Sequence, residues 1–207
     1  LLGYYRNNIL HLFAMPSLIS SFFQHNDSMS VTQLRESCSL LYPFLKVELF
    51  LPWEVGEFKQ YMERLIDDFV RLQLLTKSGD QLTRANVNTP QFSHLMLLGR
   101  TLGQTFDRFA VVAALLGKHN QSEELDREEI EQKSQLMAQR ISLLAGKSAP
   151  EFADKQLFSN YFEILKKHGY LQPGSPGKVK VDNKIIHLYN CSIHLLGADM
   201  RNAIQRM

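Results

Sequence analysis

The segment Thr89–Gly117, TPQFSHLMLLGRTLGQTFDRFAVVAALLG, decides the fold class of this sequence. It opens with Thr89 and Pro90, an N-cap residue followed by a proline at the first helical position. Apolar residues then recur mostly every three, four or seven positions, up to a stop signal at Gly117. They are Phe92, Leu95, Leu102, Phe106, Phe109, Val112, Ala113 and Leu116. The pattern predicts one amphipathic helix of about seven turns, which needs partner helices to cover its apolar face.

Other segments repeat this helical spacing on both sides of the central one. They are 4–24, 30–45, 57–72, 126–146, 148–169 and 182–204. Pro16 and Pro43 fall inside two of these patterns. We expect Pro16 to kink or break its helix into two short pieces, and Pro43 to interrupt the next helix after Tyr42. Ser30–Gln33 fits a capping box, and Asp126 is the expected N-cap of a helix that carries Glu129 at the matching position. Ser148–Pro150 is the expected start of the following helix.

Two short hairpins follow predicted helices. The first comprises 73–76, a turn at 77–80 and then 81–83; the second comprises 170–171, a loop at 172–177 and then 178–181. A helix followed by a hairpin is typical of a winged-helix unit, and its recurrence is a weak internal repeat. The sequence therefore predicts a mostly α fold of about eight helices with two small wing-like β-hairpins.

The predicted organisation has a connector and a helical domain. Residues 1–25 form a connector helix, and residues 26–207 form the domain, either as one body or as two winged-helix-like halves, 26–117 and 118–207. The net charge of +2 is too small to require a nucleic acid or a membrane as partner. No stretch reaches the roughly 18 uncharged apolar residues of a membrane-spanning helix. Because the chain begins at Leu1 rather than methionine, we expect it to be a piece of a longer protein.

Few residues have a spacing that suggests chemistry. His187, Cys191 and His194 share one face of the last predicted helix. Three ligands so close together would strain to reach one zinc ion and no fourth is evident, so we predict no metal site. Gly174–Lys178 lacks the spacing of a phosphate-binding loop and is interpreted as a wing turn. No cofactor motif is present, and Cys38 and Cys191 are interpreted as reduced core thiols.

His194 and Asp199 form an H-x-x-x-x-D pattern, in which a histidine can act as a general base that an aspartate orients. On one continuous helix the two side chains would lie about 140° apart, so we interpret the match as coincidence. Gly99 and Gly103 form a small-x-x-x-small pair that would permit close helix packing. Because Arg100 follows Gly99 directly, we predict packing inside a soluble bundle rather than in a membrane.

Lysines gather around the second hairpin. They are Lys166, Lys167, Lys178, Lys180 and Lys184. Such lysines could hold phosphates, but the preceding helix lacks an arginine and Glu151, Asp154 and Glu163 would repel a nucleic acid. We therefore expect no nucleic acid, and a solvated face or one turned toward an anionic membrane remains open.

Three blocks of sequence carry a resemblance to a known family. The first is Tyr4–His11 (YYRNNILH) with Met15–Ile19 (MPSLI). The second is Leu41–Leu51 (LYPFLKVELFL) with Trp53. The third is Ala138–Leu144 (AQRISLL) with Gly146, Ala149–Phe152 (APEF), Asp154 and Lys155. In this order they resemble the C-terminal region of the bacterial membrane-bound glycerol-3-phosphate acyltransferases. The tail Tyr189–Ile204 fits the same region.

This resemblance implies a parent enzyme that transfers a fatty acyl group from acyl-ACP or acyl-CoA to the sn-1 hydroxyl of glycerol 3-phosphate. The product is lysophosphatidic acid, an intermediate in phospholipid synthesis. The resemblance places the parent at the cytoplasmic face of the bacterial inner membrane, without a cofactor or a metal. The family's catalytic H-x-x-x-x-D and arginine blocks lie upstream of Leu1, so no catalytic residue is assigned and the chain alone is predicted to be inactive.

The expected partner is therefore the upstream catalytic domain of the same polypeptide. Under this hypothesis Tyr4, Tyr5, Phe13, Phe22 and Phe23 include part of the interface with that domain. The alternative is a winged-helix module that binds nucleic acid or regulates another protein. A third possibility is a peripheral membrane anchor that uses residues 9–23 or the lysines within 166–184.

Overall fold

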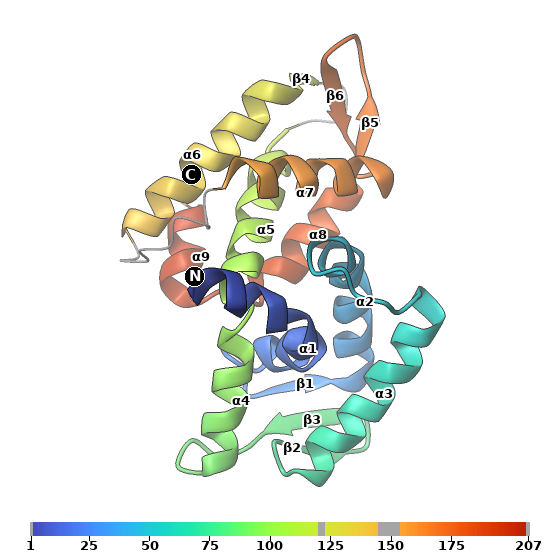
Figure 1. Ribbon diagram of the computed structural model, residues 1–207, viewed down its shortest axis with the longest axis vertical. Coiled ribbons are helices and arrows are strands. Elements are labelled where there is room, and N and C mark those ends of the chain that lie inside the picture. The colour runs from blue at the N-terminus through green and yellow to red at the C-terminus, as the bar shows by residue number, and fades with distance from the viewer. Residues whose placement is uncertain (1, 120–122, 145–153, 206–207) are drawn as a thin grey trace. The chain divides into compact units, whose positions relative to one another are not determined.

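A computed structural model describes residues 2–119, 123–144 and 154–205, with the side chains of all but 2–9, 55, 141–144 and 205. Within these residues it confirms a mostly α fold (Figure 1). The helices are α1 (Leu2–Phe22), α2 (Val31–Glu48), α3 (Val55–Arg71), α4 (Pro90–Arg100), α5 (Gly103–Leu116), α6 (Arg127–Leu144), α7 (Lys155–Lys167), α8 (Lys184–Ile193) and α9 (Ala198–Gln205). The strands are β1 (Ser28–Ser30), β2 (Leu75–Ser78), β3 (Gln81–Arg84), β4 (Glu124–Asp126), β5 (Leu171–Pro173) and β6 (Lys178–Val181).

The chain folds as two compact units, Leu1–Gly103 and Gln104–Met207. Both predicted hairpins are present as β2–β3 and β5–β6, and each gains a third strand that the sequence did not predict. The strand orders are β1-β3-β2 and β4-β6-β5, all antiparallel. Each unit therefore runs helix, strand, two helices, hairpin and helix, and the second unit adds a further helix, α9. In both units the strand before the helix pair lies beside the last strand of the hairpin. This shared topology strengthens the weak repeat found in the sequence.

The two units also share details at their turns. The Val31 amide donates to the Asp80 carbonyl in the first unit, and the Arg127 amide donates to the Gly177 carbonyl at the same place in the second. Gln73 and Gly169, which follow α3 and α7, both adopt a left-handed backbone, with φ of 58° and 74°. The same local hydrogen bonds therefore end the corresponding helices.

The buried faces of α3 and α7 correspond position by position. The equivalent pairs are Met62 with Phe158, Leu65 with Tyr161, Ile66 with Phe162, and Phe69 with Leu165. All eight side chains are buried, and each pair has the same separation along the chain. In the second unit Phe109 stacks on Tyr161 with ring centroids 4.6 Å apart and an interplanar angle of 9°. The repeat therefore extends from the topology to the core pattern.

The predicted N-terminal caps of α2 and α6 are confirmed. The Ser30 hydroxyl accepts the Gln33 amide at 3.0 Å, and the Gln33 side chain returns to Ser30 to complete a capping box. Asp126 Oδ1 accepts the Glu129 amide at 2.9 Å. For α7 the predicted start at 148–150 lies outside the described residues, and Asp154 caps the helix that begins at Lys155.

α1 and α2 run through Pro16 and Pro43 as continuous helices, so the predicted division of the first helix into two pieces and the predicted interruption at Pro43 are wrong. An internal proline removes one helical hydrogen bond and costs about 3 kcal/mol. Apolar side chains next to both prolines are buried, and each contributes about 1.5–3 kcal/mol. They include Met15, Leu18 and Ile19 in α1, and Tyr42, Phe44 and Leu45 in α2. Burial on both sides of the proline outweighs the lost hydrogen bond.

Two predicted long helices are instead divided. The central segment forms α4 and α5, with a turn at Thr101–Leu102 where the Thr101 hydroxyl and amide both bond back to the preceding turn. The last predicted helix forms α8 and α9, separated around Gly197 by tight turns of the same kind. Glycine has low helix propensity, and in both places the apolar period continues across the break and conceals it.

Close packing of α1 against α4 forms a large part of the first unit's core. Ser21 donates to the Gly99 carbonyl at 3.0 Å, and Gln24 donates to the Met96 carbonyl at 2.8 Å. A Cβ atom at Gly99 would lie only 2.2 Å from Gln24 Nε2, whereas one at Gly103 would meet nothing within 4 Å. Close packing in a helical bundle is thus confirmed for Gly99 but not for Gly103.

Candidate interaction surfaces

No group of three or more His, Cys, Asp or Glu side chains within the described ranges could hold a metal ion. His187 is exposed on α8, Cys191 is buried, and His194 follows the end of the helix. The absence of a metal site at these three residues stays a prediction, and they form no ligand set here.

Contrary to the prediction from the sequence, His194 and Asp199 do not lie on one continuous helix, because α8 ends at Ile193 and α9 begins at Ala198. His194 lies at the C-cap of α8, and Asp199 lies in the first turn of α9. Both side chains are exposed. No catalytic role is assigned to them, in keeping with the upstream position that the family resemblance gives to the motif.

The Gly174–Lys178 segment is the turn of the second hairpin, as predicted. The Gly174 amide donates to the Lys178 carbonyl, and Gly177 adopts a φ of 78°. The Ser175 hydroxyl and amide donate to the two carboxylate oxygens of Glu124 at 2.7 and 3.3 Å. These hydrogen bonds, the hydroxyl bond above all, lower the pKa of Glu124. Because the Ser175 donors of this loop already bind the Glu124 carboxylate on β4, we interpret the loop as a turn and not as a phosphate-binding site.

Carboxylates accompany the lysines around this hairpin. Lys180 lies 3.5 Å from Glu124, and Lys178 is the register partner of Asp126. On α7 the exposed Glu163 pairs with Arg127 at 2.6 Å. A surface with alternating charge signs is a poor match to a continuous phosphate backbone.

Each unit has a groove between its second and third helices. The groove between α2 and α3 has a volume of about 700 Å³ and is crossed by Arg35, which binds both carboxylate oxygens of Glu63 at 2.5 and 2.6 Å. The equivalent groove between α6 and α7 has a volume of about 400 Å³, and its Arg127 pairs with Glu131 on α6 and with Glu163 on α7. Because these arginines already bind carboxylates, we interpret both grooves as helix–helix contacts held by ion pairs.

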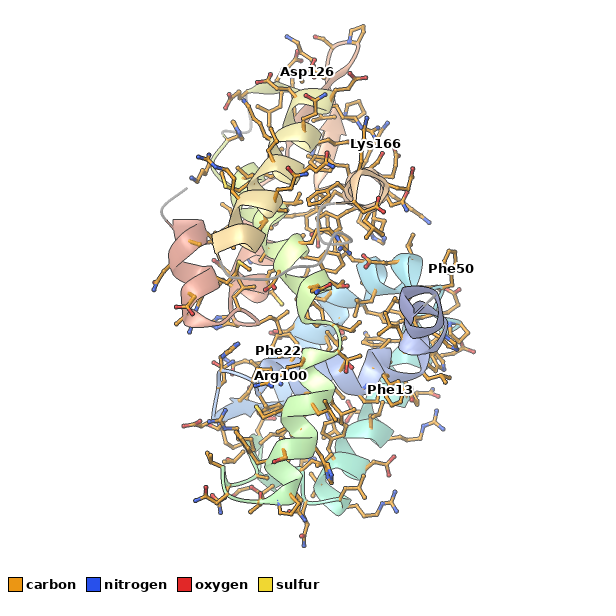
Figure 2. All side chains as sticks on the ribbon, turned by 60° about the vertical axis from the view of Figure 1, so that its left-hand side comes forward. Phe13, Phe22, Phe50, Arg100, Asp126 and Lys166 are labelled. Carbon is orange, nitrogen blue, oxygen red and sulfur yellow. The ribbon has the colours of Figure 1, made fainter. Side chains whose placement is uncertain are left out.

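The exposed apolar surface of the first unit differs from the predicted interface. Phe22 and Phe23 are fully buried within the chain, so the prediction that they face another domain is wrong. Phe13 is 43% exposed, and its neighbour Leu12 is 63% exposed. Tyr4 and Tyr5 belong to α1, but their side chains lie outside the described set. Figure 2 shows Phe22 where α1 meets α4 and Phe13 on α1 away from that contact.

Sequence reasoning missed Phe50, whose side chain is 90% exposed. It follows α2 in the run Leu49–Leu51, where every residue is apolar and no period separates the buried from the exposed side chains. Leu51 is 3% exposed, although it has the same apolar character. The exposure of Phe50 is thus evident only once the backbone turn that ends α2 is known.

None of the helices within the described residues is long and apolar enough to cross a bilayer. The described residues form a mostly helical protein of two compact units, each with a small three-stranded antiparallel sheet, and they present ion-paired grooves and exposed apolar side chains. The family model of the glycerol-3-phosphate acyltransferase C-terminal region matches residues 1–174, and the chain belongs to this family.

Curated relatives agree with that assignment. Glycerol-3-phosphate acyltransferases from Pseudomonas entomophila (strain L48) and Pseudomonas aeruginosa (strain LESB58) are 38% and 37% identical over 100% and 99% of the chain. The Ectopseudomonas mendocina (strain ymp) protein of that name is 40% identical over 86%. The chain spans only about a quarter of the length of these relatives.

Proposed function

We propose that the chain is the non-catalytic C-terminal domain of an sn-glycerol-3-phosphate 1-O-acyltransferase. The observation that carries this proposal is the match to the C-terminal region over residues 1–174, in a chain that spans a quarter of its relatives. The parent transfers a fatty acyl group from acyl-ACP or acyl-CoA to glycerol 3-phosphate and gives lysophosphatidic acid. Its catalytic residues lie in the remaining three quarters of the polypeptide.

The partner of this domain is the upstream catalytic domain of the same polypeptide. Residues 1–25, which include α1, act as the connector, and Leu12 and Phe13 contribute apolar surface to the contact. Burial of such side chains is the usual driving force between domains. The parent acts at the cytoplasmic face of the bacterial inner membrane and needs no cofactor or metal from this domain.

An acyl-transfer assay tests the proposal. The 207-residue chain and the full-length parent are each supplied with palmitoyl-CoA and radiolabelled glycerol 3-phosphate. We expect lysophosphatidic acid only from the full-length protein. A full-length variant with alanine at both Leu12 and Phe13 should lose activity or inactivate at a lower temperature. Turnover by the isolated chain would contradict the non-catalytic assignment, and wild-type behaviour of the variant would remove α1 from the interface.

The second candidate is a winged-helix nucleic-acid-binding or regulatory module, which the strand orders β1-β3-β2 and β4-β6-β5 favour. The charges disfavour it, because Glu63, Asp67 and Asp68 on α3 lie where a recognition helix would approach phosphates. Salt-dependent binding of duplex DNA at micromolar concentration would support this candidate. Flotation with anionic vesicles separately tests whether residues 9–23 or the lysines within 166–184 contact a membrane.

A further inference from the structure

Phe50 has an unfavourable backbone conformation and an unfavourable environment. Its φ is 53°, in the left-handed region that glycine adopts without strain and a bulky residue rarely occupies. The turn ends α2, with the Leu51 amide donating to the Lys46 carbonyl at 3.0 Å. The Phe50 side chain is also 90% exposed, the highest fraction among the large apolar residues described. Neither the turn nor the core explains a phenylalanine here, which directs attention to a binding role.

The residues around Phe50 hold it in a defined position. Leu51 is buried, and the Trp53 carbonyl accepts the Tyr42 hydroxyl at 2.5 Å. The Trp53 ring stacks on Tyr61 with centroids 4.5 Å apart. Lys46 and Glu54 form an ion pair at 2.5 Å across the turn. The backbone at Phe50 is therefore held by packed neighbours, so binding would have to order the Phe50 side chain but not the turn that carries it.

More exposed apolar side chains lie on α2 and on α1. Val47, on the last turn of α2, is 42% exposed, and α1, which packs against α2, exposes Leu12 and Phe13. Figure 2 shows Phe50 at the outer edge of the first unit. Buried aromatic anchors dominate the affinity of many protein interfaces. The pair Val47 and Phe50, here named the Phe50 surface, has the composition of such an anchor.

We propose that the Phe50 surface is the anchor by which this domain binds the catalytic part of the acyltransferase polypeptide. This inference rests on the proposed function. The chain covers about a quarter of its relatives and matches their C-terminal region, so a long segment of the parent precedes α1. That segment is covalently joined to the unit that carries Phe50, which raises the effective concentration of the segment at the Phe50 surface. A contact as small as one aromatic side chain and its neighbour can then hold the two parts together.

The charges around Phe50 favour a protein partner over a lipid surface. Glu48, Glu54 and Glu57 lie at the end of α2 and the start of α3, and Lys46 on the last turn of α2 is paired with Glu54. An anionic bilayer attracts lysine and arginine and repels carboxylates. Carboxylates at the end of α2 and the start of α3, on both sides of Phe50 in the chain, therefore make this surface poorly suited to an anionic membrane.

Phe50→Gly tests the proposal, because we expect it to stabilise the 207-residue chain and to destabilise the same turn in the full-length parent. In the 207-residue chain the substitution relieves the left-handed strain and should raise the Tm. In the full-length parent it removes the anchor, so hydrogen exchange at the amides of 46–51 should accelerate at least tenfold relative to wild type. Gln73→Gly is the matched control, because Gln73 has a similar φ of 58°. It should raise the Tm of the chain and leave exchange at 46–51 in the parent unchanged.

Several outcomes would overturn the inference. Equal exchange at 46–51 in the wild-type chain and the wild-type parent would show that nothing covers Phe50. A lower Tm for the Phe50→Gly chain would show that Phe50 packs inside the chain, and flotation with anionic vesicles that depends on Phe50 would show a lipid contact. An inactive wild-type parent would instead contradict the proposed function, which the assay of acyl transfer measures separately.

Discussion

At the scale of single residues, the internal repeat supplies comparisons within one chain. Gln73 and Gly169 occupy equivalent positions after α3 and α7, and both are left-handed. In each turn the next residue returns its amide to the helix, Leu74 to Phe69 and Tyr170 to Leu165. The backbone requirement is therefore the same, but only one unit meets it with glycine.

Gln73→Gly should stabilise the chain by about 0.5–1 kcal/mol, because glycine removes the left-handed strain while the hydrogen bonds remain. Gly169→Ala should destabilise it by about 1 kcal/mol. An alanine Cβ at position 169 would lie 3.7 Å from Lys184 Nζ, an ordinary contact, so the cost is that of the backbone alone. Urea denaturation of both variants measures the two changes in the free energy of unfolding. Changes of the same sign would contradict the view that both positions require a left-handed backbone.

Tyr42 should make stability depend on alkaline pH. Burial raises the pKa of its hydroxyl to about 12, with Glu54 and Glu57 adding to the effect. Because the folded-state pKa exceeds the ordinary value near 10, the contribution to stability is complete below pH 10 and is lost as the pH rises through 12. Tyr42→Phe should reduce this dependence between pH 10 and 12. It should also cost about 1 kcal/mol at neutral pH by leaving the Trp53 carbonyl without this donor. Thermal unfolding against pH tests both statements, and an unchanged alkaline slope would rule out Tyr42 as its source.

At the scale of elements, the contact between α1 and α4 organises the first unit. Gly99 permits their close approach, and Gln24 crosses the contact to the Met96 carbonyl. Ser21 on α1 donates to the Gly99 carbonyl across this contact, and Ser17 and Ser21 are both buried. The separation of these two helices is thus set by small residues on both.

Gly99→Ala should destabilise the chain by about 1 kcal/mol, because the new Cβ displaces the Gln24 amide and its hydrogen bond. Gly103→Ala is the control, since a Cβ there meets nothing within 4 Å, and its effect should stay within about 0.5 kcal/mol of zero. Differential scanning calorimetry compares the two. An equal loss of stability in the two variants would mean that the close approach of α1 and α4 at Gly99 is not what makes the first substitution destabilising.

The sequence predicts elements well where the signal is local. The cap at Ser30, the turn at Gly79 and the buried stripe of α3 all follow from residues close together in the chain. The strands β1 and β4 were missed because each has only three residues and pairs with a strand far along the chain. Thr101–Leu102 was missed because the apolar period continues through the break.

The sequence predicted the exposed apolar surface of the first unit only in part. Phe13, which was predicted to belong to an interface, is 43% exposed, whereas Phe22 and Phe23 were predicted with it but face the core. Whether an apolar residue on a helix faces its own domain or another depends on which neighbour covers it, and sequence period alone does not encode this. Phe50 required the backbone conformation as well, because its unusual feature is a positive φ.

At the scale of the whole molecule, the central claim is that this domain is one part of a longer acyltransferase. Two repeated helical units with ion-paired grooves and an exposed aromatic residue suit a domain that packs against another. The relatives of this family are about four times as long as the chain, and the resemblance places the catalytic H-x-x-x-x-D and arginine blocks in the part that precedes Leu1.

The most direct test is the nucleotide sequence of the native reading frame upstream of Leu1. Our account predicts several hundred codons in the same frame that encode an H-x-x-x-x-D motif and the arginine blocks of the acyltransferases. A native start codon within a few residues of Leu1 would contradict it, because no catalytic domain would then exist in the polypeptide.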